Sequence, residues 1–402
     1  MDNKSQRRIL VTGASIAGPT IAYWLNKYGF EVTVLERASE LRLGGQNIDV
    51  KGPALEIARK MGLEEAIRKA NTTEVGLRFV DTNNQTLAEF SKESALSMTQ
   101  DLEILRGDFV NILYNLTKDD VNYRFNDYVN HVEQYEDKVT VTLHSGSKED
   151  FELLIIAEGI GSLTRKLVFG TEPTFKFLKL YTAYFTIAKA PTDDQWARWC
   201  NATTGIVFMM RPDNHGTTRA SITFLSKEEK YTKLTLDQQK KVLTEKIRGL
   251  GWETDRLIAE IQKSEDLYFE RVSQVKAPNW SKGRVIMIGD AAYCATPISG
   301  KGIDLSMVGA YVLAAELQKN ESHSEAFVEY EAIMRPYVNK CQELPPGVPG
   351  LVYPTSTLGV HVLNTLFKIV GSGPVQWFIS LFTGKKDSKI DIELPDYDHK
   401  IQ

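Results

Sequence analysis

A glycine turn between two apolar segments limits most strongly what this chain can fold into. Residues 13–18 read Gly-Ala-Ser-Ile-Ala-Gly, a G-x-G-x-x-G pattern with Ser15 at the second glycine position. An apolar run at 9–12 precedes the turn, and a helix-like pattern at 19–27 and a strand-like run at 31–36 follow it. This order predicts a β-α-β unit, the opening of a parallel sheet.

The turn and the acidic residue after it predict a dinucleotide site. A tight strand-to-helix turn lets backbone N–H groups meet a pyrophosphate at the positive end of the helix. Glu36 lies 23 residues after Gly13, at the end of the next strand, where a carboxylate can accept hydrogen bonds from ribose hydroxyls. A glycine turn alone also occurs as a plain turn in unrelated α/β folds. The placed acid favours dinucleotide binding over that alternative.

A second motif runs from Gly289 to Gly302. The buried strand expected at 283–290 delivers Asp290 to its carboxyl end, where the side chain can hold ribityl or ribose hydroxyls. The Gly300-Lys301-Gly302 turn then opens a helix whose N–H groups can stabilise negative charge. The alternative is a strand, a loop and a helix that bind no ligand.

The strand patterns divide the chain into three parts. Alternating apolar and polar residues at 181–188, 205–211 and 218–225 predict an antiparallel sheet that is inserted into the first domain. Before this insertion, the apolar run at 153–157 predicts a buried strand that returns to the first sheet. We therefore expect an α/β fold: a Rossmann-like nucleotide-binding domain with an inserted antiparallel β-sheet substrate domain and C-terminal helices. The expected ranges are 1–170 and 272–342 for the discontinuous nucleotide-binding domain, 171–271 for the substrate-binding domain and 343–402 for the C-terminal helical segment.

Composition and charge disfavour several classes of protein. The chain of 402 residues has a net charge of -4 and no sustained Lys/Arg cluster, which argues against nucleic acid and favours a small-molecule ligand. The apolar stretches 360–370 and 375–382 are too short to cross a bilayer, which needs about 20 residues, so we expect no stable membrane insertion. The first residues lack a signal-peptide pattern, so we expect a cytoplasmic protein, and we expect a monomer.

Cysteines and histidines are scattered along the chain rather than grouped. Three widely spaced cysteines fit neither a disulfide framework nor a metal site, so we expect reduced structural thiols. The six histidines show no ligand spacing either, so we expect no bound metal. The cysteines are Cys200, Cys294 and Cys341.

Both motifs resemble those of the group A flavoprotein monooxygenases, the family of aromatic hydroxylases such as para-hydroxybenzoate and salicylate hydroxylases. Residues 13–18 with Glu36 and Arg37 are similar to that family's ADP-binding fingerprint, and residues 289–302 are similar to its second FAD motif. Arg106 is similar to the family's flavin-contacting arginine. The resemblance covers nearly the whole chain and implies that FAD is the cofactor. The residues it assigns to FAD are Gly13, Ser15, Ala17, Gly18, Glu36, Arg37, Arg42, Gly45, Asp49, Arg106, Asp290, Pro297, Gly300 and Gly302.

Within this family, the chain most resembles the tetracycline-inactivating enzymes, the tetracycline destructases. The matching stretches are 44–52, 103–108 and 309–311. The resemblance to the group A family implies that the loop with Arg42 passes the isoalloxazine ring, and the likeness to the destructases implies that Asp49 faces the flavin. These stretches line the flavin more than the substrate, so they predict the cofactor better than the antibiotic.

Three positions depart from the family's pattern. The middle motif, usually Asp-Gly, reads Glu158-Gly159, with Ser162 and Arg165 after it. Tyr293 stands where a His is common, and Asp304 stands where an Asn is usual. These departures motivate an alternative hypothesis, a flavin-containing ligand-binding protein without turnover.

The resemblance implies a monooxygenase that uses FAD, dioxygen and NADPH or NADH to hydroxylate a phenolic or enolic ring through a flavin C4a-hydroperoxide. A tetracycline-type antibiotic is the first candidate substrate. Because the cofactor performs the hard chemistry, we expect no catalytic nucleophile among the side chains. The alternatives are a hydroxylase of another catabolic or secondary-metabolite substrate, and a different flavin reaction.

The substrate is expected to contact the inserted sheet. On the strand at 205–211 alternate residues share a face, so Arg211 points one way and Phe208 and Met210 the other, and one face should line the pocket. Arg211 is alternatively a solvated charge at a strand end, and Phe208 and Met210 are alternatively core residues. The C-terminal helices either gate the site or brace the two domains. The substrate candidates are Tyr184, Phe208, Met210 and Arg211.

Overall fold

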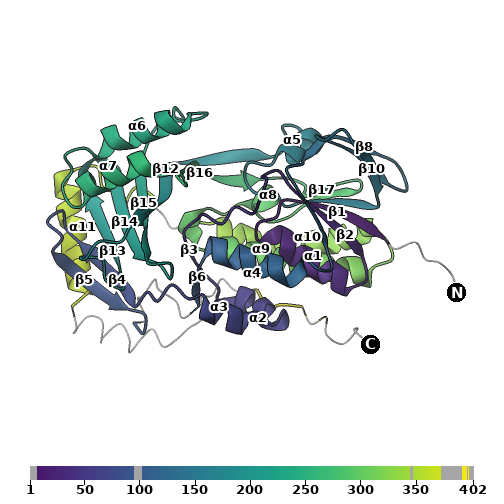
Figure 1. Ribbon diagram of the computed structural model, residues 1–402, viewed down its shortest axis with the longest axis horizontal. Helices are drawn as coiled ribbons and strands as arrows, with labels where there is room; N and C mark the ends of the chain where they lie inside the picture. Colours follow the sequence, from purple (N-terminus) through teal and green to yellow (C-terminus); the bar gives the residue numbers. More distant parts are fainter. Residues whose placement is uncertain (1–6, 95–101, 345–346, 373–391, 396, 398–402) are drawn as a thin grey trace.

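The protein consists of two halves that lie side by side along its long axis (Figure 1). The computed structural model describes residues 7–94, 102–344, 347–372, 392–395 and 397. We call the half built on a six-stranded, mainly parallel sheet the nucleotide half, and the half built on a seven-stranded sheet the β half. The predicted α/β fold class is confirmed.

The sheet of the nucleotide half has the strand order β17-β18-β11-β1-β2-β7. Its strands pair in parallel, except β17 with β18. The central strands are buried on both faces and therefore read as continuous apolar runs. The bounds are β1 (Arg8–Thr12), β2 (Glu31–Glu36), β7 (Asn122–Phe125), β11 (Leu153–Ile156), β17 (Ser281–Lys282) and β18 (Val285–Met287). As predicted, the chain returns to this sheet through β11, which pairs with β1.

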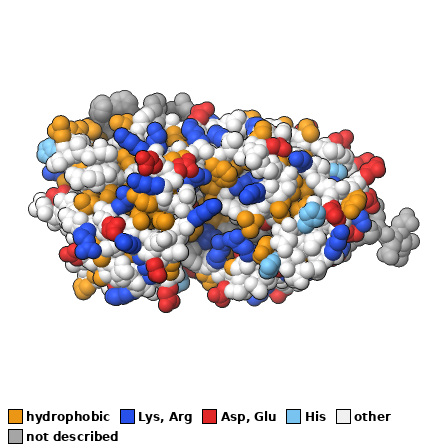
Figure 2. All heavy atoms as spheres, turned by 90° about the horizontal axis from the view of Figure 1, so that it is seen from above, with side chains coloured by type: hydrophobic (Ala, Val, Ile, Leu, Met, Phe, Trp, Pro, Cys, Tyr) orange, Lys and Arg blue, Asp and Glu red, His pale blue; other side chains and the backbone are white. Residues whose placement is uncertain are grey.

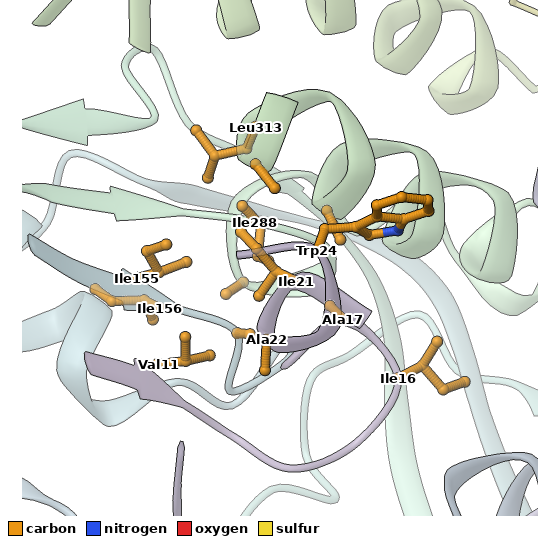
Figure 3. Packing of buried hydrophobic residues seen from close by; sticks show 14 of the residues in the cluster. Val11, Ile16, Ala17, Ile21, Ala22, Trp24, Ile155, Ile156, Ile288 and Leu313 are labelled. Carbon is orange, nitrogen blue, oxygen red and sulfur yellow. The ribbon is translucent and has the colours of Figure 1, made fainter. Parts of the chain in front are cut away.

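Helices pack against this sheet and against one another. They are α1 (Ala17–Lys27), α2 (Gly52–Lys60), α3 (Glu64–Lys69), α4 (Arg106–Thr117), α5 (Leu163–Phe169), α8 (Asp290–Tyr293), α9 (Gly302–Lys319) and α10 (His323–Gln342). Figure 3 shows Val11 of β1, Ile21 of α1 and Leu313 of α9 among the side chains of one buried cluster. The ring of Trp24 meets that of Tyr311 edge to face, with centroids 4.8 Å apart. This packing holds α1 against α9.

Two small sheets complete the nucleotide half. An antiparallel sheet has the order β10-β9-β8, and a two-stranded sheet pairs β3 with β6. In the second sheet Asn47 lies opposite Leu105, which brings the loop after β2 beside the start of α4. The bounds are β3 (Asn47–Asp49), β6 (Glu103–Leu105), β8 (Val129–Gln134), β9 (Val139–Leu143) and β10 (Lys148–Phe151).

The β half is built on a sheet of order β16-β12-β15-β14-β13-β4-β5. All pairings are antiparallel except that of β13 with β4. The bounds are β4 (Gly76–Val80), β5 (Thr86–Ser91), β12 (Thr174–Ala188), β13 (Trp196–Ala202), β14 (Ile206–Pro212), β15 (Thr217–Leu225) and β16 (Tyr268–Lys276), with η1 (Thr203–Gly205) before β14.

Side chains of this sheet alternate between two faces. The outer face packs on α6 (Leu236–Ile247) and α7 (Thr254–Lys263), where Phe208 and Leu243 share one buried cluster. The inner face turns toward the nucleotide half, because Val207 of this face packs in a cluster with Ile298 of the second motif. Substrate contacts from this sheet must therefore come from the inner face.

Strands β4 and β5 lie within residues 1–170, the range expected to form only the nucleotide-binding domain, yet they extend the seven-stranded sheet through β13. Pairing with β13 covers the edge that β13 would otherwise expose. The sheet therefore takes residues from both sides of the expected boundary at 171. The sequence located the strand near 77–81 but did not indicate its partner.

Helix α11 (Thr357–Val370) confirms the helix expected at 360–370. It packs against β5, and the ring of Phe367 stacks on that of Phe79 with centroids 3.9 Å apart. Phe79 and Met209 belong to the same cluster, so α11 covers the outlying strands of the inner face. The stretch predicted at 375–382 lies outside the described residues.

Candidate active site

The glycine turn after β1 has a backbone that only glycine fits well. Gly13 has φ +99°, and a Cβ on it would lie 2.5 Å from the carbonyl oxygen of Ala157. A Cβ on Gly18 would overlap the carbonyl oxygen of Gly13. The two glycines thus let α1 begin directly against the turn, as a pyrophosphate cradle requires.

The start of α1 offers backbone donors to an anion. The helix begins at Ala17, no side chain caps it, and no acidic residue lies in its first turn. The first N–H groups of a helix lack partners within the helix and carry its positive dipole end. These donors fit the pyrophosphate of a dinucleotide.

Glu36 lies where the sequence predicts it, at the end of β2. Its carboxylate accepts hydrogen bonds from the backbone N–H groups of Ala14 and Ala38, each at 3.0 Å, and is almost fully buried. The guanidinium of Arg42 lies 3.8 Å away, and the side chain of Arg37 is exposed. Glu36 therefore shapes the glycine turn, and its position beside the turn fits a ribose.

Arg106 fixes the loop that follows β2. Its guanidinium donates to Ser15 Oγ at 2.8 Å and to the carbonyl oxygens of Gly44 at 2.9 Å and Arg42 at 3.2 Å. Burial, with a smaller effect of Arg42, lowers the pKa of Arg106. A Cβ on Gly45, which has φ +133°, would lie 3.1 Å from Arg106 Cδ. Arg106 thus ties both the glycine turn and the loop at residues 42–44 to the start of α4.

The second motif lies against the first. Asp290 follows β18, and a Cβ on Gly289 would lie 3.2 Å from Cβ of Ala17 at the start of α1. Burial raises the pKa of Asp290, and its carboxylate oxygens can accept hydrogen bonds from the hydroxyls of a ligand. Gly300 is in the left-handed region with φ +61°, at the end of the turn η2 (Pro297–Ser299). Both predicted motifs therefore meet at one place.

The departures at the middle motif have local structural roles. Glu158 accepts hydrogen bonds from Ser162 Oγ at 2.7 Å and from the backbone N–H of Thr164 at 3.0 Å, so it holds the start of α5. Arg165 donates to the carbonyl oxygen of Ala291 at 2.9 Å, which ties α5 to the second motif.

Tyr293 is likewise a core residue. Its hydroxyl lies 2.8 Å from that of Tyr330, and its ring packs on Trp280. A Cβ on Gly309 would overlap the Tyr293 hydroxyl, so glycine at that position of α9 accommodates the tyrosine. The usual His is therefore replaced by a side chain that joins α8, α9 and α10.

The structure corrects two of the substrate candidates. Phe208 is fully buried and Met210 nearly so, on the outer face against α6 and α7. They are core residues because strand alternation places both side chains on the outer face, which these helices cover. Tyr184 lies on the opposite, inner face, half-buried beside Thr182 and Thr223, whose hydroxyl oxygens are 2.9 Å apart. Tyr184 thus remains a candidate.

Arg211 is on the inner face but is not the solvated charge considered as its alternative. Its guanidinium forms a two-point ion pair with Glu74 at 2.8 and 2.9 Å and a further ion pair with Glu103. Both carboxylates are buried. Burial is the largest cause that raises the pKa of Glu103 to about 7, and Glu74 and Asp49 raise it further. Arg211 thus joins β14 to β6, which carries Glu103, and to the segment before β4, which carries Glu74.

Sequence reasoning missed the acidic residues at this interface. Glu74 and Glu103 are far from Arg211 in the chain, so no spacing links them. Tyr268 and Glu270 on β16 also lie on the inner face, four and two positions before Val272 of the inner-face cluster. Strand alternation at 268–276 was the one available signal for them.

The residues present fit FAD. Two backbone cradles, a half-buried aspartate and an acid at the end of β2 lie close together in the nucleotide half. Figure 2 shows Lys and Arg side chains around a hollowed part of the protein surface. Within the described ranges, no three His, Cys, Asp or Glu side chains are grouped to hold a metal ion. In the same ranges no helix is long and apolar enough to cross a membrane.

Comparison with known proteins gives relatives that are consistent with an FAD site. The family model for the FAD binding domain matches residues 6–343. Flavin-dependent monooxygenase eupH from Phoma sp is 34% identical over 425 residues, covering 97% of each chain. A flavin-dependent monooxygenase from Legionella longbeachae serogroup 1 (strain NSW150) is 37% identical over 339 residues, covering 84% of this chain and 87% of that protein. The crystal structure of tetracycline destructase Tet(55) is 31% identical with a TM-score of 0.81, covering 98% and 99% of the two chains.

The fold, the two cradles and these relatives define an FAD-dependent monooxygenase. Relatives with that activity in their names match most of the chain, so the hypothesis of a binding protein without turnover is not needed. The chain belongs to the FAD binding domain family.

Proposed function

We propose that this enzyme hydroxylates a phenolic or enolic ring compound, with a tetracycline-type antibiotic as the first candidate. The observation that carries the proposal is the inner face of the seven-stranded sheet, which presents hydroxyl-bearing side chains opposite the second FAD motif. Tyr184, Thr182 and Thr223 lie there, and Ile298 of the motif packs against the same face. The likeness to Tet(55), which extends over 98% of the chain, supports the choice of antibiotic.

The protein's part is to hold the cofactor and to place the substrate. The N–H groups at the start of α1 would bind the pyrophosphate, Glu36 the adenosine ribose, and Asp290 the ribityl hydroxyls. Bound FAD supplies the redox chemistry, with NADPH or NADH as the source of electrons and dioxygen as the source of the oxygen atom. The two halves would exclude water from the space between them.

Tyr184 is the proposed substrate contact. Burial raises the pKa of its hydroxyl, which therefore stays protonated at neutral pH and can donate a hydrogen bond to a ring oxygen. Arg211 is already paired with two carboxylates, so we assign it a positioning role: it holds the end of β14 beside β6 and the segment before β4. The FAD contacts of Arg37, Arg42 and Asp49 stay predictions, as do a monomeric state and a cytoplasmic location.

The test is NADPH oxidation by the FAD-loaded enzyme with and without tetracycline and a panel of phenols, followed by mass analysis of the products. A substrate-stimulated rate with a product one oxygen heavier supports the proposal. Stimulation by simple phenols but not by tetracycline would support the alternative, a hydroxylase of another aromatic substrate. Stimulated oxidation with products that have only lost hydrogen would contradict hydroxylation.

A matched pair of variants locates the substrate. Tyr184→Phe removes the inner-face hydroxyl, and Tyr181→Phe removes one from the outer face, where Tyr181 accepts a hydrogen bond from the Tyr231 backbone N–H at 3.3 Å. We expect Tyr184→Phe to raise KM about 5- to 10-fold, the size of one hydrogen bond of about 1 kcal/mol or slightly more. Tyr181→Phe should leave KM unchanged. Equal effects of the two variants would refute the inner-face site.

A further inference from the structure

Glu270 stands out among the acidic residues that face the nucleotide half. It is on β16, where Tyr268 pairs with Tyr184 and Glu270 pairs with Thr182 of β12. Val272, two residues further on, packs with Val207 and Ile298 in the inner-face cluster. Side chains at 268, 270 and 272 share one face, so Glu270 looks into the same space as the proposed substrate contact.

The surroundings of Glu270 contain no cation partner within the described part of the chain. Its carboxylate receives one hydrogen bond, from the Tyr268 hydroxyl at 2.8 Å, and no cation is among the described groups that shift its pKa. The groups that face Glu270 from other elements are Asp290, Cys294 and Tyr184, and none of these side chains carries a positive charge. Arg106 lowers the pKa of Tyr268 but is not among the groups that shift the pKa of Glu270.

This environment brings the titration of Glu270 close to neutral pH. Burial is the main cause that raises its pKa to about 7, Asp290 adds to the rise, and the hydrogen bond from Tyr268 opposes it. Glu103 has a pKa raised equally far, but its oxygens are occupied by Arg211, Asn47 and Thr72. Glu270, by contrast, has oxygen lone pairs available to a ligand.

We propose that Glu270 is a catalytic residue that accepts the proton of the substrate's acidic hydroxyl. The substrate O–H bond breaks, its electron pair stays on the substrate oxygen, and the proton forms the O–H bond of the neutral Glu270 carboxylic acid. The anionic oxygen makes the ring more electron-rich and so more reactive toward an electrophilic oxygen atom. The substrate class that follows is a phenol or enol whose acidic hydroxyl reaches β16. This inference rests on the proposed function.

Tyr268 gives the proton a way out. Its hydroxyl is bonded to Glu270, and the side chain is 50% exposed. Solvent can therefore exchange the Glu270 proton through the tyrosine hydroxyl after each turnover. Burial raises the pKa of Tyr268, so it stays protonated and serves as a relay rather than as the base.

The first test measures ionisation at equilibrium, without NADPH or turnover. 4-Nitrophenol, whose ionised form absorbs visible light, is added to the FAD-loaded enzyme just below the phenol's own pKa. We expect the ionised fraction of 4-nitrophenol to be larger when it is bound to the wild-type enzyme than when it is free in solution. Glu270→Gln should bind 4-nitrophenol in its neutral form. Glu265→Gln, an exposed position just before β16, is the control and should behave as wild type. No excess of phenolate in the wild-type enzyme would overturn the proposal.

The second test uses the pH dependence of kcat/KM with a phenol that stimulates NADPH oxidation. The acidic limb in the wild-type enzyme should have an apparent pKa near 7. Glu270→Gln should remove that limb and lower kcat/KM about 100-fold, and Glu270→Asp should restore part of the rate. An unchanged limb in Glu270→Gln, with products still one oxygen heavier, would overturn the role of Glu270 while the proposed function stands.

Discussion

The glycine turn at the end of β1 provides the sharpest test of where FAD binds. In Gly13→Ala the new Cβ would lie 2.5 Å from the Ala157 carbonyl oxygen, whereas ordinary contact begins at 3.4 Å, so the two atoms must separate by roughly 0.9 Å. The neighbour is the backbone directly after β11, which is held by a hydrogen bond from the Ala157 N–H to the Thr12 carbonyl oxygen, so the turn itself has to shift. Overpacking of this kind costs about 1–3 kcal/mol, and the positive φ of Gly13 adds about 1–2 kcal/mol.

We therefore expect Gly13→Ala to bind FAD about 100-fold more weakly, which corresponds to about 3 kcal/mol. The assay is titration of the apoprotein with FAD, followed by quenching of flavin fluorescence, with circular dichroism to confirm the fold. Gly29→Ala is the matched control, because Gly29 also has positive φ, +85°, but a Cβ there meets no atom within 4 Å. It should lose some stability and no FAD affinity. Normal FAD binding by Gly13→Ala would refute the location of the cradle.

Two further variants test the substrate side of the site. Arg211→Met leaves Glu74 and Glu103 buried without their cation, so we expect the free energy of unfolding to fall by about 3–5 kcal/mol at pH 8 in urea titrations. The loss should be smaller at pH 5, because Glu103, with a pKa raised to about 7, is then protonated; an equal loss at both pH values would contradict the ion-pair explanation. Phe208→Ala should lower the free energy of unfolding by about 3–5 kcal/mol, measured the same way, without raising the KM of the folded enzyme. A large rise in KM would instead indicate that Phe208 contacts the substrate.

The parts of the fold that depend on local backbone geometry were predictable from the sequence. The turn requires glycine at 13 and 18 because of its backbone conformation and its close backbone contacts, whatever surrounds it. Glu36 follows at a fixed distance along the β-α-β unit. Asp290 likewise follows directly from its strand and turn. These positions are local in sequence, so spacing alone locates them.

The substrate side depended on contacts that spacing cannot reveal. Strand alternation correctly separated Phe208 from Arg211, but the choice of inner face depends on α6 and α7, which pack on the opposite one. The partners of Arg211 lie 137 and 108 residues away, at Glu74 and Glu103. The pairing of β4 with β13 is similarly remote, which is why the expected boundary at 171 did not anticipate it.

The measurement that tests the central claim most directly is the origin of the oxygen in the product. FAD-loaded enzyme is given NADPH and the substrate that stimulates it under dioxygen labelled with oxygen-18, and the product is analysed by mass spectrometry. The account predicts one labelled oxygen atom per product molecule and one NADPH consumed for each. A product without label, or NADPH consumption that yields only hydrogen peroxide from every substrate in the panel, would contradict a monooxygenase acting on phenolic or enolic rings.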